Sequence, residues 1–334
     1  GGYYFFYFKA QTLIQALVAN AADYGEKIKG AAYPLYLFGR VGVGDAFAMA
    51  VVSAVVLALF ALMWALISRS FLKIATSSGN TAKKVYKETA VKQKSIAAAL
   101  LAKEFGRFTA SPNYMLNCGL GILLLPIAGV MLLWKGSDVI SVLNEVFGAR
   151  AGCVPVLLCA VVCMLASMND MAAPSVSLEG KSLWLMQSLP VTPWQVLRGK
   201  LGMQLILTEI PVLFCIICIA FIYPFNTLEL ILTALVPMLY VLLSALFGLF
   251  LGLKMPNLNW TSEITPIKQS APVAIALFSG FGYTVLLCGG YMLLNGWKLG
   301  FVGYMSLLGA VTLALCGLLY FWLKNMGSKL FAGL

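Results

Sequence analysis

Long apolar stretches separated by polar segments dominate the chain, and seven of them hold the roughly 20 mainly apolar residues that a helix needs to cross a hydrocarbon core. Composition agrees, because 61% of the residues are hydrophobic and 10% are charged, against roughly a quarter charged in soluble domains. The pattern predicts an all-α, polytopic helical membrane protein with about seven transmembrane helices. They lie at residues 45–68, 113–134, 153–173, 203–224, 227–252, 272–294 and 300–323.

Basic residues gather in the segments on one side of these stretches. The segment 69–112 holds nine Lys and Arg, and with 174–202, 253–271 and the tail 324–334 it accounts for 16 of the 23 in the chain. By the positive-inside rule we expect these segments and the C-terminus in the cytoplasm, and residues 1–44 outside. The net charge of +11 then reflects topology and attraction to anionic lipid, and we expect no nucleic-acid partner.

Residues 1–44 are predicted to form an outer or interfacial segment. They begin Gly-Gly-Tyr-Tyr-Phe-Phe, without an initiator Met, a basic leader or a small-residue cleavage site, so we expect a fragment of something longer. Two interpretations stay open. Either the first residues end a missing transmembrane helix, or an amphipathic helix lies on the outer surface, and aromatic belts favour an interface in both cases.

The segment 69–112 ends in a predicted amphipathic helix over residues 95–109. Such a helix would lie in the plane of the lipid headgroups. Ser111 and Pro112 then supply a cap and a first-turn proline for the next span. The helical wheel puts apolar side chains on one side and basic ones opposite: Leu101, Phe105 and Phe108 against Lys103 and Arg107.

The segment 174–202 carries apolar side chains where the charge pattern predicts cytoplasm. Thr192-Pro193-Trp194-Gln195 predicts a capping box and a helix start at Thr192, and a short helix over 178–188 should end before Pro190. These apolar side chains either tuck back against the bundle or fit a groove on a partner protein. The candidate contact residues are Glu179, Gly180, Lys181, Trp184, Leu185, Leu189, Pro190 and Arg198.

The same segment contains Gly180-Lys181-Ser182, which resembles the end of a phosphate-binding loop. That loop needs a glycine five residues earlier, where its backbone wraps the phosphate, and position 175 is a serine. The chain also has no histidine and none of the common hydrolase or metalloprotease motifs. We therefore expect no enzyme, no cofactor and no metal in this chain.

A second polar segment, 253–271, is too polar for lipid and too apolar for a plain linker. It either anchors at the interface around its tryptophan or contacts a partner. Its candidate residues are Trp260, Glu263, Lys268 and Gln269.

Two carboxylates fall within predicted spans: Asp170 near the end of the third, and Glu209 about two turns into the fourth. Carboxylates in hydrocarbon are costly and normally face a bundle interior or water. No second intramembrane acid or histidine lines up with them as a proton relay, which weighs against an ion-coupled transporter.

Small residues also recur in the spans. The eight cysteines form no metal pattern and are interpreted as packing residues. Ser244, Gly248 and Gly252 repeat at four-residue spacing, which fits ordinary bundle packing or a subunit interface.

Three pieces of sequence together resemble the membrane subunit of ABC-2 type transporters, and in particular the ABC exporter permeases of Gram-positive bacteria. The likeness covers about residues 95–323. Its most specific parts are the E-G-K and S-L-P pieces and the later N-W-T-S-E…K-Q-S run. They stand in LLAKEFGRFTASPNYMLN, SLEGKSLWLMQSLPVTPWQVLRGKL and PNLNWTSEITPIKQS.

The resemblance implies a role for each segment. Residues 95–109 would be the connecting helix, 113–323 one complete six-helix half, and 177–199, within 174–202, the coupling region that docks on an ATPase subunit. The span 45–68 would end a preceding half. The implied partners are that ATPase, which would bind ATP and Mg, and a second permease half, fused or separate, in a bacterial cell membrane. The outer link before the last span is too short for the large extracellular gate of some relatives.

Two other functions stay open at this point. An ion-coupled secondary transporter or channel without an ATPase predicts sensitivity at Glu209 and nearly silent changes in the loops. A membrane-embedded enzyme or sensor subunit lacks support, since polar catalytic groups are missing from the sequence.

Overall fold

The computed structural model describes residues 29, 33–76, 95–147 and 152–334. The structure is 86% helical, and these residues contain no strand, which confirms the all-α prediction. The chain divides into two units, Gly1–Ala90 and Val91–Leu334, which are described separately. Most of the predicted outer segment and the polar run 77–94 lie outside the described residues.

The first unit contains α3 (Tyr33–Gly42) and α4 (Ala46–Thr76). The Asp45 carboxylate starts α4 by accepting the backbone N–H groups of Phe47 and Ala48 at 2.9 and 3.2 Å, as an N-cap residue does. The predicted span 45–68 therefore lies on one long helix. Its apolar side chains are exposed, with Trp64 at 68%.

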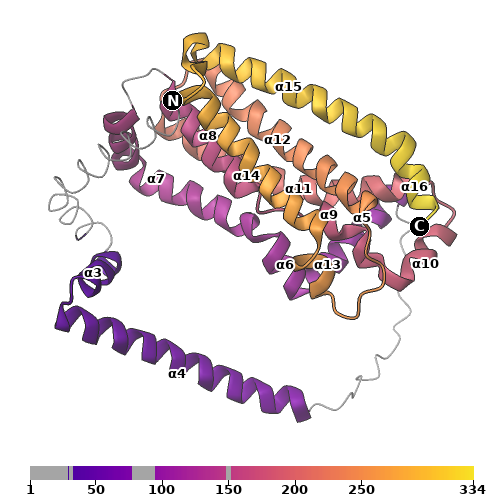
Figure 1. The fold of residues 1–334 in the computed structure, drawn as a ribbon, viewed down its shortest axis with the longest axis horizontal. Coiled ribbons are helices and arrows are strands. Elements are labelled where there is room, and N and C mark those ends of the chain that lie inside the picture. Colours follow the sequence, from indigo (N-terminus) through magenta and orange to yellow (C-terminus); the bar gives the residue numbers. More distant parts are fainter. Residues whose placement is uncertain (1–28, 30–32, 77–94, 148–151) are drawn as a thin grey trace, which may run out of the picture. The chain divides into compact units, whose positions relative to one another are not determined.

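In the second unit, five further stretches of the described residues are long and apolar enough to cross a membrane, and α4 brings the number to six. The short helix α6 (Pro112–Cys118) precedes these five stretches. Figure 1 shows the long helices of the second unit running side by side. The main helices are α7 (Leu120–Phe147), α11 (Pro193–Ile222), α12 (Thr227–Lys254), α14 (Ala271–Met292) and α15 (Gly300–Trp322).

The predicted helix starts are confirmed. Thr192 accepts the Gln195 backbone N–H at 3.3 Å, and the Gln195 side chain accepts the Thr192 backbone N–H at 2.8 Å. Ser111 caps α6 with Pro112 in its first turn. The second stretch is not one helix as predicted. Helix α6 ends at Cys118, and α7 begins after Gly119. An added Cβ at Gly119 would lie 2.7 Å from the Phe108 ring.

The third stretch, predicted as one span over 153–173, is broken in the structure. Helix α8 covers Cys153–Ala166, and α9 covers Ala172–Ser175. Three of the five residues between them are polar (Ser167, Asn169 and Asp170), and Ser167 donates its hydroxyl to the Met164 carbonyl at 2.6 Å. Ser, Asn and Asp side chains compete with helical hydrogen bonds in this way. At 1.5 Å per residue, 14 residues span about 21 Å, short of the ~30 Å core.

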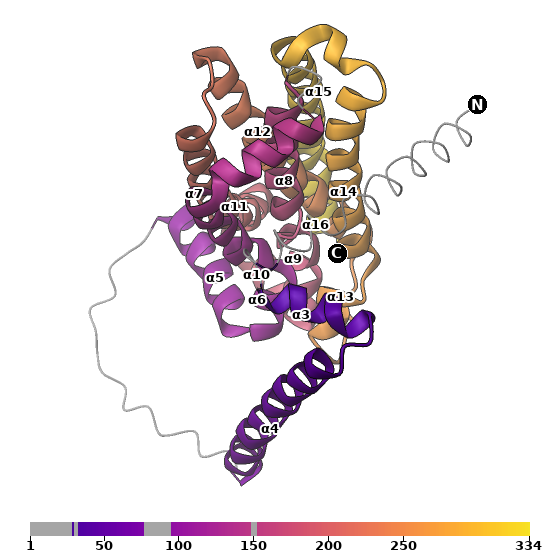
Figure 2. The same ribbon diagram turned by 90° about the vertical axis from the view of Figure 1, so that its left-hand side faces the viewer.

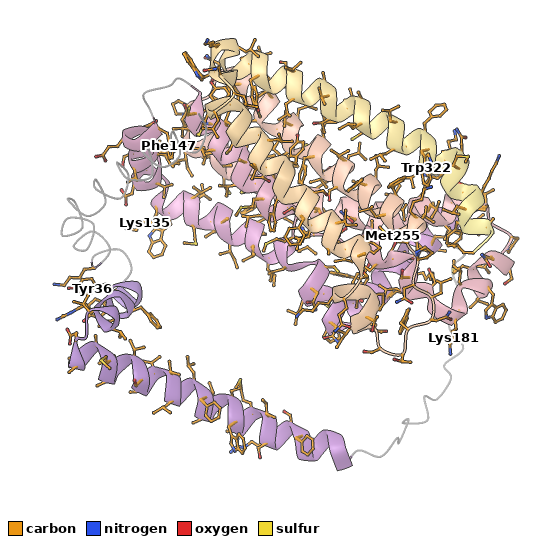
Figure 3. All side chains as sticks on the ribbon, in the orientation of Figure 1. Tyr36, Lys135, Phe147, Lys181, Met255 and Trp322 are labelled. Atoms are coloured by element: carbon orange, nitrogen blue, oxygen red, sulfur yellow. The ribbon has the colours of Figure 1, made fainter. Side chains whose placement is uncertain are left out.

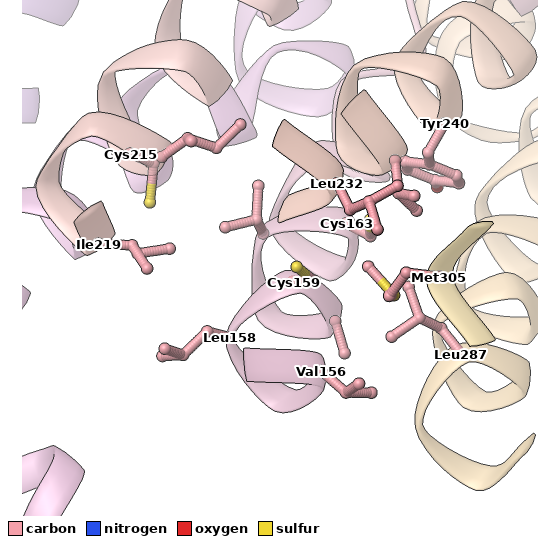
Figure 4. Packing of buried hydrophobic residues seen from close by; sticks show 14 of the residues in the cluster. Val156, Leu158, Cys159, Cys163, Cys215, Ile219, Leu232, Tyr240, Leu287 and Met305 are labelled. Atoms are coloured by element: carbon pink, nitrogen blue, oxygen red, sulfur yellow. The ribbon is translucent and has the colours of Figure 1, made fainter. Parts of the chain in front are cut away.

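The main core lies where α8 meets α11, α12, α14 and α15. Cys159 is completely buried there, and Figure 4 shows Leu232, Leu287 and Met305 converging around it from three helices. Seven of the eight cysteines are buried and Cys288 is partly buried, so they pack as small apolar residues.

The small-residue repeat on α12 packs inside the bundle. An added Cβ at Gly252 would lie 2.4 Å from the Ala173 carbonyl oxygen, and Ser244 accepts a hydrogen bond from Gln204 at 3.3 Å. Of the two interpretations of this repeat, the structure supports bundle packing.

Short helices collect at one end of the second unit, which we name the loop end. It comprises α5 (Ile96–Ala110), α6, the 3₁₀ helix η1 (Ser177–Ser182), α10 (Leu183–Ser188), α13 (Ile264–Lys268) and α16 (Ser328–Ala332). Both ribbon views place α5, α6, α10 and α13 together there. Figure 3 shows Lys181 at its edge, with Phe147 at the far end of α7.

Candidate functional site

The loop end joins the segments that the charge pattern assigned to one side. Ser111 donates to Glu263 at 2.9 Å, and the Trp260 indole donates to the Ser177 carbonyl at 2.6 Å. The Gln187 amide donates to the Phe331 carbonyl at 3.0 Å. Residues 95–112 and the other three basic segments therefore lie together at one end of the second unit, in line with the prediction that they share a side. That this side is the cytoplasm stays a prediction.

The segment 177–190 has two faces, one buried and one exposed. Leu178, Leu183 and Met186 are 8%, 4% and 6% exposed, so they pack against the bundle. The opposite face presents an apolar ridge, in which Trp184 and Leu185 are 66% and 51% exposed. The buried face agrees with the interpretation that these side chains tuck back against the bundle, and contact of the exposed face with a partner stays a prediction. We name the exposed face the ridge, and it consists of Lys181, Trp184, Leu185, Leu189 and Pro190.

Beneath the ridge, Glu179 is the centre of a buried ion-pair cluster. Its Oε1 lies 2.6 Å from Lys200 Nζ and 2.5 Å from Lys103 Nζ, and its Oε2 lies 2.6 Å from an Arg107 nitrogen. Lys200 also reaches Glu104 at 3.0 Å and donates to the Ser175 carbonyl at 2.9 Å. The cluster therefore ties η1 to both α5 and α11.

The cations in this cluster favour the ionised form of Glu179. Burial alone would raise the pKa of Glu179, but Lys200, Arg107 and Lys103 outweigh it and hold that pKa well below its usual range. Burial also lowers the pKa of Lys103, with Lys200 as the next cause. Three cations thus face two carboxylates in this cluster, and Lys103 is the more exposed of the two lysines.

The orientation of α5 differs from the predicted one. Its buried stripe is Leu100, Glu104 and Phe108, and Lys103 and Arg107 point towards Glu179. The wheel put these two basic residues opposite the apolar side, and the structure turns them towards a buried carboxylate. The reason is that Glu179, distant in sequence, supplies a buried partner for them.

The two polar segments pack on each other at Gly180. This residue has φ +53° and ψ −138°, a combination that essentially only glycine adopts. An added Cβ would lie 3.2 Å from the Trp260 ring, and the Asn257 backbone N–H donates to Ser177 Oγ at 3.0 Å. Trp260 is therefore half-buried against η1 and holds the second segment on the first.

The remaining candidates are at the surface. Glu263, Lys268 and Gln269 are exposed, and Glu263 accepts from Ser111. Arg198 is exposed beside a groove of about 200 Å³ between α5 and α11, which Leu101 and Gly202 also line.

The two intramembrane carboxylates lie in different places. Asp170 is 4% exposed, in the break between α8 and α9. Glu209 is partly buried on α11, and its Oε2 has no hydrogen-bond partner. Neither belongs to the ion-pair cluster.

The sequence interpretation missed Glu104 and Lys200 as members of the site. Lys200 is 0% exposed and lies just before a predicted span, where a lysine is normally read as a boundary residue. A signal was present, because a lysine within an otherwise apolar helix requires a partner. Its partner could not be chosen without the fold.

Long apolar helices packed around a buried core define a helical membrane protein. The chain belongs to the family described as membrane proteins of 12 TMs, whose profile matches residues 2–324. It is therefore a multi-span membrane protein. No curated protein and no solved structure matches it.

Proposed function

We propose that this chain is the permease subunit of an ATP-driven exporter of the ABC-2 type, energised by a separate ATPase subunit. The observation that carries the proposal is the combination of the exposed ridge with the ion-pair cluster beneath it. The ridge offers a surface for a partner, and the cluster connects that surface to the long helices.

The ridge has the composition of a protein-binding surface. Its centre is an exposed tryptophan beside an exposed leucine, and large aromatic side chains commonly supply most of the energy of such interfaces. Leu189, 41% exposed, and Lys181 lie at its rim. A groove on an ATPase subunit is the proposed partner.

The ion-pair cluster connects movement of the ridge to movement of the long helices. A partner that pulls on α10 also moves η1, and Glu179 is bonded to side chains of α5 and α11. Helix α11 continues as one element from Pro193 to Ile222, so a shift at the loop end reaches the far end of the bundle. Coupling requires the ATPase to contact the ridge differently in its two states.

The rest of the proposal follows from the family likeness. ATP and Mg would be bound by the ATPase, and this chain would contribute no catalytic residue. A second permease half would complete the pathway, which fits a family with 12 transmembrane segments. The expected location is a bacterial cell membrane with the loop end in the cytoplasm, and the expected direction of transport is outward.

The test is a binding measurement with any ABC ATPase subunit that is found encoded beside this gene. Trp184→Ala should weaken the affinity of the purified subunits at least tenfold and reduce stimulation of ATP hydrolysis by the permease. The matched control is Trp134→Ala, since Trp134 is 81% exposed midway along α7, away from the ridge, and its loss should leave both quantities unchanged.

Two outcomes would contradict the proposal. One is normal binding and stimulation by Trp184→Ala. The other is transport that runs on an ion gradient without any ATPase and is lost in Glu209→Gln, which would support the secondary transporter instead.

A further inference from the structure

The break between α8 and α9 contains polar side chains that are buried without partners. Asp170 is 4% exposed, and neither of its carboxylate oxygens has a hydrogen-bond partner. Asn169 is 0% exposed, and both polar atoms of its amide lack a partner. Buried polar groups are nearly always hydrogen-bonded, so this break requires an explanation.

Close packing surrounds the break on three sides. An added Cβ at Gly248 of α12 would lie 2.8 Å from Asp170 Oδ1, and one at Gly121 of α7 would lie 2.7 Å from Asn169 Oδ1. On α14, an added Cβ at Gly280 would lie 2.6 Å from Ser167 Cβ. Three helices thus bring glycine backbone against the break, and the structure leaves little space beside the Asp170 carboxyl group.

No cation in the described residues forms an ion pair with Asp170. Lys200, on the adjacent α11, is already bound to Glu104 and Glu179. The titratable groups that face the break from the helices packed on it are neutral in their ordinary forms. They are Tyr114 and Cys118 of α6, Tyr240 of α12 and Tyr283, which stacks on Tyr240 from α14.

An ionised carboxylate in such a place is unfavourable, because no cation among the described residues faces it and the nearby backbone N–H of Ala173 offsets only part of its lost hydration. A metal ion would need several oxygen ligands, and no group of three Asp, Glu, His or Cys that could hold one occurs in the described residues. A proton is the one cation that needs no added space, since it binds covalently to the carboxyl oxygen.

We propose that Asp170 is a proton-binding site, neutral when the α8–α9 break is packed as in this structure, and that its ionisation opens the break to water. In that step the O–H bond of the carboxyl group breaks, the proton passes to water and the electron pair stays on the carboxylate. The site is independent of ATPase binding at the ridge.

Infrared spectroscopy of the purified chain in lipid nanodiscs tests the proposal directly. A carbonyl stretching band of a protonated carboxyl group should persist at neutral pH, when exposed carboxylates are ionised. It should be absent from Asp170→Asn and shifted in Asp170→Glu, which keeps the carboxyl group if the Asn variant fails to fold. Glu209→Gln is the control and should keep the band.

The second measurement is the unfolding temperature against pH. As pH rises, the wild type should lose stability while Asp170→Asn does not, so the Asn variant should gain at least roughly 2–4 °C over the wild type. The proposal is overturned by a band unchanged in both Asp170 variants, or by a gap that does not grow with pH. A sodium effect would also overturn the proposal. If sodium raises the unfolding temperature of the wild type but not of Asp170→Asn, and choline raises neither, the site holds a metal ion.

Discussion

Glu179 and Asp170 are two carboxylates nine positions apart in the chain with nearly the same burial, at 3% and 4% exposed. Their surroundings are opposite. Glu179 faces three cations, whereas neither oxygen of Asp170 has a partner among the described residues. Burial alone therefore does not determine the charge of a carboxyl group in this bundle. The presence or absence of neighbouring cations determines it.

The difference also separates a fixed region from one that can change. The ion-pair cluster fastens η1 to α5 and α11, so the loop end should move as one body. The break at Asp170 holds polar groups whose hydrogen bonds are unmade, and a rearranged or hydrated break would satisfy them. We therefore expect the loop end to transmit motion and the break to accommodate it.

Removing a cation from the paired side should give the largest effect. In Lys200→Met, Glu104 and Glu179 lose their fully buried partner. Loss of one member of a buried ion pair typically costs about 3–5 kcal/mol of unfolding free energy. Unfolding in mixed micelles measures this loss.

The matched control for that experiment is Lys181→Met, which removes an exposed lysine from the same segment. It should change the unfolding free energy by no more than about 0.5 kcal/mol. Equal effects of the two variants would show that the cluster does not stabilise the loop end.

Gly180→Ala should come next in size. The substitution forces a Cβ into a backbone conformation reserved for glycine and against Trp260, which should cost about 1–3 kcal/mol. Gly106→Ala is the control, because a Cβ there meets no atom within 4 Å and alanine favours the helix by up to about 1 kcal/mol. Thermal unfolding of both variants should give shifts of opposite sign.

Lowering the pH should change the stability contributed by Glu179 in the opposite direction to that contributed by Asp170. Because the folded-state pKa of Glu179 lies below its ordinary value of 4.5, its stabilising contribution is present above that pH and is lost as pH falls below it. The advantage of the wild type over Glu179→Gln should therefore shrink from pH 6 to about pH 3. An advantage that grows on acidification would contradict the cluster as described.

The smallest effect on stability is expected at the ridge. Trp184→Ala removes a side chain that is 66% exposed, so the unfolding free energy should change by about 0.5 kcal/mol or less. A loss comparable to that of Gly180→Ala would mean that the ridge is part of the packed core and is not free to bind a partner.

The sequence was sufficient for features that depend on local pattern. Apolar length predicted the long helices, and Thr192 with Gln195 predicted the start of α11. Pro190 predicted the end of a short helix over 178–188, although the structure has η1 up to Ser182, with the non-helical Gly180 inside it, and α10 from Leu183.

Features that depend on contacts between distant residues could not be predicted in the same way. The inward orientation of Lys103 and Arg107 depends on Glu179, more than seventy positions away. The close approach of α7 to the break after Ala166 is also a contact between distant residues, since an added Cβ at Gly121 would lie 2.4 Å from the Leu165 carbonyl oxygen. A hydropathy pattern considers each stretch of sequence separately, so it predicted an unbroken helix over residues 153–173.

The last turns of the chain have a practical consequence. After α15, a π-helix at Leu323–Gly327 leads into α16, whose Phe331 is 1% exposed and accepts the hydrogen bond from Gln187 of α10. An affinity handle fused beyond residue 334 would emerge next to α10. Purification tags and fluorescent fusions in that position would compete sterically with any protein that docks there, so binding assays should carry their labels elsewhere.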